Sequence, residues 1–291
     1  MHQEKSTNLS PANNMKSATL FVILALGFAF LYWLLVALAR AGHVPFSMPD
    51  SLAGTLLKGV LRDFGPAIAA VLAAGLTQGR AGLLRLWSSL SRWRIPAWLY
   101  LLAFIVPFIA DGIVVAVGVF TGTLKRGAGP FSPLHFLVVF IAMAIVDGPL
   151  GEEIGWRGKL LPELLQRMRP LTASVVVGSI WCLWHVPLYI ADGRSINWAN
   201  YLAGTIAYSI VFTWFYLRSG GSTLLSILLH NTTNFAIYLL LLNLWTPTAD
   251  VHSTNVPYDV VWFLTAGIAA IGLWRMSPIV LSDNSPDDIT N

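Results

Sequence analysis

Residues 151–158 read Gly-Glu-Glu-Ile-Gly-Trp-Arg-Gly inside an apolar run that begins near Phe131 and continues to Leu165. Two adjacent carboxylates and an arginine therefore interrupt a stretch that is long enough to cross a bilayer. An ionisable side chain at membrane depth costs at least about 2.5 kcal/mol, so a cluster of them indicates a site whose members compensate one another. We take this octapeptide as the first part of a candidate active site.

The composition predicts an integral membrane protein. Of the 291 residues, 56% are hydrophobic and only 11% are charged, and the mean hydropathy is +0.67. Soluble domains usually carry about 25% charged residues. Apolar runs of about 20 residues indicate membrane helices, because strands of a membrane barrel have about 10 residues with strict alternation. The predicted fold is an all-α, polytopic membrane bundle of about eight transmembrane helices.

Short polar turns divide the apolar sequence into segments. The predicted spans are residues 18–39, 56–77, 95–120, 131–165, 172–190, 199–217, 223–244 and 258–274. The fourth segment is too long for one straight span, and Pro149 is expected to break it. Asp147 is placed to cap the helix that follows this break.

These spans form one predicted membrane domain, residues 18–276, whose motif-bearing core is residues 131–244. A polar N-terminal tail at residues 1–17 and a disordered C-terminal tail at residues 277–291 are expected to flank it. Most of the 18 Lys and Arg residues fall on the tails and on alternate loops. The positive-inside rule then places both termini in the cytoplasm. Short loops favour a bacterial plasma membrane.

The same distribution of charge argues against nucleic-acid binding. The net charge is +4, but the basic residues lie at the ends of apolar segments and form no basic stripe. The single cysteine, Cys182, excludes an intrachain disulfide and a cysteine-based zinc site. The expected partners are therefore the lipid bilayer and a membrane-associated protein or peptide substrate.

Helical geometry assigns different roles to the two adjacent glutamates. Glu153 and Arg157 are four residues apart, so they share a helix face and can form an ion pair. Glu152 lies about 140° around the axis from Arg157, at 100° per residue, and can face a cavity. The spacing predicts that Glu153 and Arg157 give structural support and that Glu152 carries chemistry.

Two histidines within predicted spans can join Glu152. The turn at Arg169-Pro170 lies about midway in sequence between Glu152 and His185, so the two residues come nearly level across a helical hairpin. His230 and Asn234 are four residues apart and share one face of a later span. A carboxylate, two imidazoles and an amide can therefore converge.

Such a set suits hydrolysis. Glu152 with His185 can activate a water as general base, while His230 and Asn234 can donate hydrogen bonds to an oxyanion. The same Glu152, His185 and His230 can instead bind a divalent metal such as zinc. The sequence alone does not separate these two readings, although the missing H-E-x-x-H motif removes the most specific argument for zinc. The serines lack a nucleophile elbow, which argues against a serine triad.

Three ordered motifs carry a resemblance to a known family. They are Glu152-Glu153-x-x-x-Arg157, Trp181-x-x-x-His185 and His230-x-x-x-Asn234. The chain resembles the CAAX proteases and bacteriocin-processing enzymes, the CPBP or Abi family, over roughly residues 142–242. One departure is Trp181, where the family usually has Phe.

The resemblance implies an intramembrane endopeptidase of eight helices, similar to the type II CAAX prenyl endopeptidase. It implies cleavage of membrane-associated substrates at a site that opens to the cytoplasm. Eukaryotic members remove the last three residues of prenylated CAAX proteins. Carried onto this sequence, the family assigns water activation to Glu152 and His185, oxyanion binding to His230 and Asn234, and helix fixing to Glu153 with Arg157. A metal-free, glutamate-type reaction is favoured, with a metalloprotease as the alternative.

Two other classes remain as alternatives. One is a non-proteolytic membrane protein, for immunity or scaffolding, that retains the motifs for packing. The other is a proton-coupled transporter that uses Asp111, Asp147 and Glu152, although the sequence has no sign of inverted repeats. The sequence assigns no site role to Asp111 or Asp147.

Overall fold

Helices form almost all of the described structure. The computed structural model describes residues 11–276 apart from residues 49, 128, 130, 131, 194, 195 and 248–255. Its α-helices are α1 (Pro11–Arg40), α2 (Leu52–Lys58), α3 (Gly65–Leu90), α4 (Ala97–Phe120), α5 (Pro133–Val146), α6 (Pro149–Gly155), α7 (Leu161–Leu165), α8 (Pro170–Ala191), α9 (Trp198–Arg218), α10 (Thr223–Ala236) and α11 (Val256–Trp274). The π-helical segments are η1 (Gly59–Asp63), η2 (Trp156–Leu160) and η3 (Ile237–Leu244), and the strands are β1 (Leu124–Arg126) and β2 (Trp245–Pro247). The all-α prediction is confirmed.

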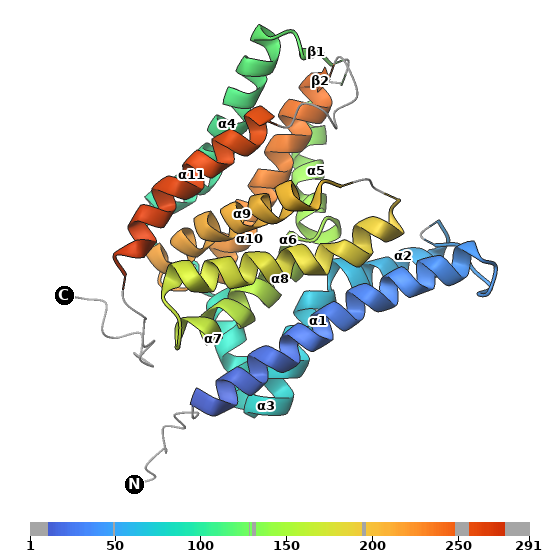
Figure 1. Ribbon diagram of the computed structural model, residues 1–291, viewed down its shortest axis with the longest axis vertical. Helices are drawn as coiled ribbons and strands as arrows, with labels where there is room; N and C mark the ends of the chain where they lie inside the picture. The colour runs from blue at the N-terminus through green and yellow to red at the C-terminus, as the bar shows by residue number, and fades with distance from the viewer. Residues whose placement is uncertain are drawn as a thin grey trace.

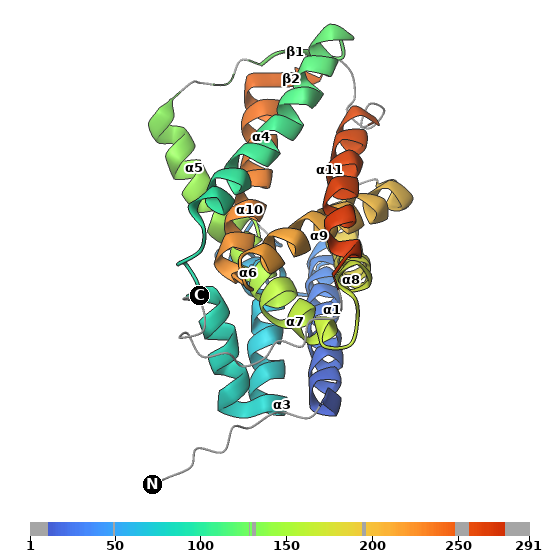
Figure 2. The same ribbon diagram turned by 90° about the vertical axis from the view of Figure 1, so that its left-hand side faces the viewer.

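The short helices α6 and α7 lie in the middle of the bundle (Figures 1 and 2). Helix α6 packs against α3 and α10, and α8 packs between α1 and α9. Helix α10 also contacts α4 and α5, while α11 lies against α9. The only strands in the described structure, β1 and β2, pair antiparallel and join the end of α4 to the end of η3. The element that carries the octapeptide is thus enclosed by longer helices.

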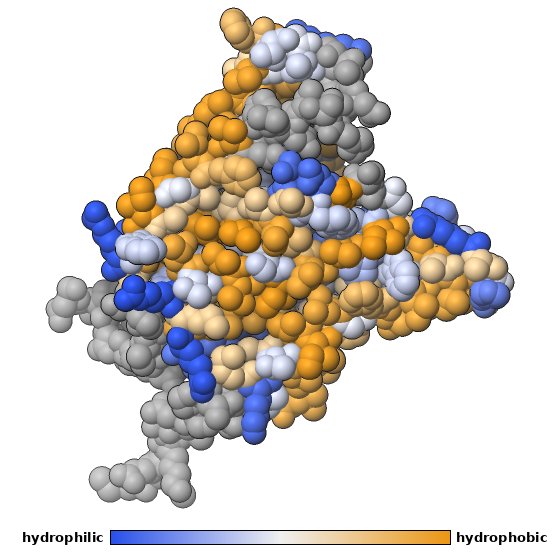
Figure 3. Space-filling model, in the orientation of Figure 1, coloured by the Kyte–Doolittle hydropathy of each residue, from blue (hydrophilic) through white to orange (hydrophobic). Residues whose placement is uncertain are grey.

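The outer surface is apolar, as a lipid-facing surface must be. Figure 3 shows hydrophobic residues over most of the visible face, with hydrophilic residues gathered at a few places. Six of the described helical stretches are long and apolar enough to cross a membrane: Met15–Arg40, Gly65–Leu90, Ala97–Phe120, Pro133–Leu165, Pro170–Ala191 and Thr223–Leu244. Exposed apolar surface on this scale is not sustained in water. The chain is a multi-pass membrane protein.

Side-chain caps explain where three of the helices begin. The backbone N–H of His135 donates to Ser132 Oγ before α5, and that of Leu225 donates to Ser222 Oγ before α10. The N–H of Asn200 donates to Asn197 Oδ1 before α9. Each bond satisfies one of the N–H groups that a helix leaves unpaired at its start.

The predicted break in the fourth segment is confirmed. Helix α5 ends at Val146, and α6 starts at Pro149, the first position at which a missing N–H costs nothing. Gly148 between them has φ of 99°, a left-handed conformation that favours glycine. Asp147 does not cap α6, because the N-cap residue is Gly148 and no side chain accepts a hydrogen bond from the first backbone N–H groups of the helix. The capping role expected for Asp147 is wrong.

Two predicted boundaries also differ from the structure. Helix α1 begins at Pro11, so residues 11–17 are helical and the predicted polar tail is shorter. The second predicted span, residues 56–77, is interrupted at Phe64, and the membrane-crossing helix begins at Gly65. Arg62 and Asp63 precede Phe64 and Gly65-Pro66 follows it, so the sequence itself favours a kink at this joint.

Helix α3 folds back on itself at Gly79. This residue has φ of 60°, and the helix has two arms on either side of it, which Figure 2 shows next to one another. Leu72 on the first arm and Leu83 on the second line one apolar cavity of about 360 Å³ together with Ile154 of α6. The second arm therefore packs against the bundle.

A buried polar cluster joins α3 to the segment after α6. Lys159 Nζ lies 2.7 Å from Glu163 Oε1 and donates to Gln78 Oε1 at 2.9 Å. Gln78 Nε2 donates to the same Glu163 oxygen at 2.7 Å. All three residues are buried, so each polar group depends on the others to replace the water it has lost. The cluster fixes the register of η2 and α7 against α3.

A Gly178→Ala variant is expected to lose about 1–3 kcal/mol of unfolding free energy through overpacking. Gly178 lies where α8 crosses α9, and an added Cβ would stand 2.7 Å from Ile206 Cα and 2.9 Å from the Thr205 carbonyl oxygen. The matched control is Gly204→Ala on α9, where an added Cβ meets nothing within 4 Å. Reversible unfolding in detergent measures both. Equal stability of the two variants would contradict close contact between α8 and α9.

Candidate active site

The octapeptide is held close to the start of α3. An added Cβ on Gly151 would stand 2.0 Å from the carbonyl oxygen of Asp63, so only glycine permits this approach. The Asp63 carboxylate pairs with Lys58 at 3.1 Å. Burial raises the pKa of the Asp63 carboxyl above its ordinary value, the Lys58 ammonium opposes this rise, and the charge of Asp147 adds to it. The loops before α3 and α6 therefore meet beside the site.

Glu153 is the centre of a fully buried ionic group. Arg157 Nη1 donates to Glu153 Oε1 at 2.9 Å and to Oε2 at 3.1 Å, and neither side chain is exposed. His230 Nδ1 lies 2.9 Å from the same Oε1 and donates to it, because an ionised carboxylate can only accept. Glu153 thus forms the expected ion pair with Arg157 and also orients His230 of α10. The sequence did not predict this second role.

The rest of the Arg157 guanidinium packs against aromatic rings. Its Cζ atom lies 5.2 Å from the ring centroid of Trp181 and 4.7 Å from that of Phe212. Nε and Nη2 have no hydrogen-bond partner within the described part of the chain. Cation–π contacts are strongest where water is excluded, and here they replace part of the lost hydration. Arg157 therefore joins α8 and α9 to the octapeptide.

Glu152 points away from this ionic group and meets two indoles. Trp181 Nε1 donates to Glu152 Oε2 at 2.5 Å, and Trp156 Nε1 lies 3.4 Å from the same oxygen. The other oxygen, Oε1, lies next to Gly148, where an added Cβ would stand 2.3 Å from it. Glu152 is 5% exposed. The two glutamates therefore have different surroundings, as the helical spacing predicts.

His185 stands one turn after Trp181 on α8, within an aromatic wall. Its Nδ1 lies 2.9 Å from the Trp181 carbonyl oxygen, which can only accept, so Nδ1 carries a proton and Nε2 is the accepting nitrogen of the neutral ring. The ring lies 5.2 Å from that of Tyr189 and 5.4 Å from that of Tyr201. The two tyrosine hydroxyl oxygens are 3.1 Å apart. Sequence reasoning missed both tyrosines, although Tyr189 follows His185 by one helical turn.

Asn234 lies one turn after His230, at the side of the site where α5 ends. Its Nδ2 donates to Asp147 Oδ2 at 3.3 Å. Asp147 directly precedes Gly148, the residue beside the Glu152 carboxylate. The contact gives Asp147 a partner that the sequence did not suggest, because the two residues are far apart in the chain.

The Trp181 ring lies next to both histidines of the predicted site. Its centroid is 5.9 Å from that of His185 and 5.4 Å from that of His230. Since its indole also bonds to Glu152, three of the four residues expected to carry chemistry surround one side chain. Asn234 has no described contact with Trp181 and reaches the site only through the Asp147 loop.

The arrangement does not suit the alternative metal site. Within the residues that the structure describes, no three His, Cys, Asp or Glu side chains are grouped as metal ligands. Glu152 accepts from indoles, while each of the two histidines donates its Nδ1 proton to oxygen. These hydrogen bonds do not decide the question, because a histidine that binds a metal through Nε2 usually donates its Nδ1 proton to oxygen in the same way. The spacing of the three side chains argues against the metal site, and no step of the chemistry below uses a metal.

The structure thus has a buried carboxylate, Glu152, and two imidazoles in fixed orientations, His185 and His230, inside a multi-pass helical bundle. This places the protein among membrane proteins that enclose a polar site. The family described as "Type II CAAX prenyl endopeptidase Rce1-like" matches residues 133–236, which include all three motifs. Over these residues the chain is similar to that family.

One curated relative is similar to part of the chain. The chain is 30% identical over 153 residues to "CAAX prenyl protease 2" of Methanococcus maripaludis. The aligned part covers 50% of this chain, and the chain spans 50% of the length of that relative. The chain is therefore a multi-pass membrane protein that is similar, over part of its length, to CAAX prenyl endopeptidases.

Proposed function

We propose that this protein is an intramembrane endopeptidase that hydrolyses peptide bonds near the C-terminus of membrane-anchored substrates, including prenylated ones. The observation that carries the proposal is the grouping of Glu152, His185 and His230 around Trp181, inside the segment that matches the family. Burial in an apolar bundle excludes bulk water, which strengthens each electrostatic contact with a bound substrate.

In the proposed reaction, Glu152 and His185 Nε2 activate one water molecule. The water oxygen forms a bond to the peptide carbonyl carbon as its proton passes to this base, and the carbonyl electron pair moves to oxygen. When the carbon–nitrogen bond breaks, the electron pair on the oxyanion re-forms the carbonyl and the same proton passes to the leaving nitrogen. The products are a new carboxylic acid, which becomes a carboxylate by losing its proton to solvent, and a shorter peptide with a free amine.

His230 and Asn234 are proposed to hold the oxyanion. Because Nδ1 of His230 already donates to Glu153, the ring can donate to a substrate oxygen through Nε2 only when both nitrogens carry a proton. The Glu153 carboxylate supports that doubly protonated form by its charge. Asn234 would add one amide N–H, since its contact with Asp147 uses only one of its two.

The wider arrangement in the membrane is also proposed here. Helices α9 (Trp198–Arg218) and α11 (Val256–Trp274) would complete eight membrane helices together with the six long apolar stretches. Both termini and the mouth of the site would then face the cytoplasm of a bacterial cell, in its plasma membrane. The substrate would approach from the bilayer.

The test uses purified protein in liposomes and a farnesylated peptide that ends in a CAAX sequence. We expect mass spectrometry to detect a product shorter by three residues, and little product from the same peptide without the farnesyl group. Folded protein that leaves both peptides whole would contradict the proposed substrate class.

Removal of metal is expected to leave the activity unchanged. Among the described residues the three candidate ligands are not grouped as a metal site, and the proposed reaction uses no bound cation. Cleavage is measured before and after dialysis against EDTA, with and without added Zn²⁺. Loss of cleavage that returns only with Zn²⁺ would favour the metalloprotease alternative.

The non-proteolytic alternative, an immunity or scaffold protein, makes the opposite prediction for two variants. It requires the Glu153–Arg157 support but not a reactive carboxylate, so Glu152→Ala would keep the cellular phenotype while Arg157→Ala would lose it. An endopeptidase loses the phenotype in both variants.

A further inference from the structure

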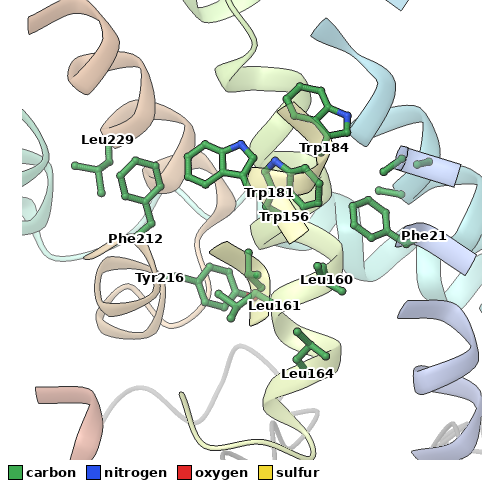
Figure 4. Close-up of a cluster of buried hydrophobic side chains, with 14 of the residues drawn as sticks. Phe21, Trp156, Leu160, Leu161, Leu164, Trp181, Trp184, Phe212, Tyr216 and Leu229 are labelled. Carbon is green, nitrogen blue, oxygen red and sulfur yellow. The ribbon is translucent and has the colours of Figure 1, made fainter. Parts of the chain in front are cut away.

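Trp181 connects the groups of the candidate active site through three different kinds of contact. It is 4% exposed and lies within the cluster of large side chains drawn in Figure 4, near Trp156 and Trp184. Its indole N–H donates to Glu152 and its backbone carbonyl accepts from His185. Its ring faces His230 at a centroid distance of 5.4 Å.

The indole contact selects one of the two Glu152 oxygens. Oε2 accepts from Trp181 Nε1 at 2.5 Å and lies 3.4 Å from Trp156 Nε1, so both indole donors lie on that oxygen. Oε1 lies on the Gly148 side, away from both indole donors, where a Cβ added to Gly148 would stand 2.3 Å from it. The carboxylate is therefore held in one rotation, with Oε1 as the oxygen that can meet a water.

The backbone of the same residue selects the tautomer of His185. Because the Trp181 carbonyl takes the Nδ1 proton, Nε2 is the basic nitrogen. The ring also lies next to both His185 and His230. One residue thus orients the proposed base at both of its components.

A phenylalanine cannot donate the hydrogen bond that this tryptophan makes. Phe has no polar atom, whereas an indole N–H donates and its bond to an ionised carboxylate is charge-assisted. The tryptophan at this position in the chain therefore adds a function beyond aromatic packing. A catalytic group gains rate when a neighbour holds it in the productive geometry before the substrate binds.

We propose that Trp181 is a positioning residue, whose indole N–H holds Glu152 Oε2 so that Oε1 faces the water that the enzyme activates. The inference rests on the proposed function for its effect on rate, but the hydrogen bond itself can be measured without any substrate.

The first measurement is an indole spectrum of ¹⁵N-labelled protein in nanodiscs. Trp181→Phe should remove one indole N–H signal, and this loss assigns the signal to Trp181. In the wild type, the chemical shift of that N–H proton should lie downfield, because the proton bonds to a carboxylate. In Glu152→Gln the same signal should move upfield, because an amide oxygen is a weaker acceptor. In Glu163→Gln, a matched change at a buried glutamate outside this site, it should stay in place. A signal that does not respond to Glu152→Gln overturns the proposal.

The second measurement is the cleavage rate of Trp181→Phe. Loss of one charge-assisted hydrogen bond corresponds to a decrease in kcat of about 10- to 100-fold, with KM unchanged. Trp184→Phe serves as the stability control. It makes the same change of indole to phenyl on α8, but the Trp184 indole nitrogen has no hydrogen-bond partner within the described residues. Both variants should unfold at similar temperatures.

The outcomes separate the two proposals. An unchanged kcat in Trp181→Phe, or a rise in KM alone, overturns the positioning role while the peptidase function stands. If the wild type cleaves nothing, the proposed function fails, and the indole signal by itself then decides whether Trp181 holds Glu152.

Discussion

A Glu152→Gln variant is expected to lose peptide cleavage by about 10²- to 10⁴-fold, the usual contribution of a general base. Glutamine has nearly the same shape as glutamate, and its amide oxygen can still accept from the Trp181 indole. The fold should therefore be retained while the group that accepts the water proton is lost. Cleavage is measured on purified protein in liposomes, with circular dichroism and unfolding temperature as checks of the fold.

Asp111→Asn is the matched control for this variant. Asp111 is also a fully buried carboxyl group in a membrane helix, but it lies on α4 and outside the site. The control should keep wild-type cleavage. If both variants lost activity equally, the loss would follow from changing a buried acid in general and not from removing a base at Glu152.

An Arg157→Met variant is expected to lose about 3–5 kcal/mol of unfolding free energy, because it leaves Glu153 as a buried charge without its partner. Both side chains are completely buried, and the guanidinium also packs against Trp181 and Phe212. The loss therefore reaches α8 and α9 as well as the octapeptide. Reversible unfolding in detergent micelles measures the effect.

Two further variants separate lost charge balance from lost packing. The double variant Glu153→Gln with Arg157→Met should recover part of the stability, because it removes the uncompensated charge. Arg218→Met removes an arginine from the exposed end of α9, where its Cζ lies 5.5 Å from the Trp214 ring centroid, and should cost only about 0.5–1 kcal/mol. If Arg157→Met were no worse than Arg218→Met, Glu153 would not depend on its ion pair.

Local features of the site could be predicted from the sequence. The break before α6 follows from Gly148-Pro149, since each residue imposes its backbone conformation without help from the rest of the chain. The contact of Glu153 with Arg157 follows from helical spacing in the same way. Membrane character follows from composition, because apolar runs of this length are not stable in water.

Contacts between distant segments could not be predicted. The bond from His230 to Glu153 and the one from Asn234 to Asp147 depend on how α10 packs against α5 and α6. Hydropathy gives the length of a span but neither its rotation nor its neighbours. The cluster of Gln78, Lys159 and Glu163 has the same origin, since no spacing in the sequence links α3 to η2.

The role of Trp181 was missed for a different reason. As an aromatic residue in a motif that usually carries Phe, it suggests packing alone, and only the geometry brings its indole N–H to Glu152. Tyr189 and Tyr201 are similar, because their hydroxyl groups meet only when α8 and α9 are side by side. Polar atoms on aromatic side chains are thus easily overlooked in an apolar sequence.

The central claim is that Glu152 enables this membrane protein to hydrolyse peptide bonds. The most direct test compares the protein termini in membranes of cells that express the wild type or Glu152→Gln at equal levels, by mass spectrometry of terminal peptides. We predict at least one new C-terminus that is present with the wild type and missing with Glu152→Gln. Identical sets of termini in the two membranes would contradict the claim.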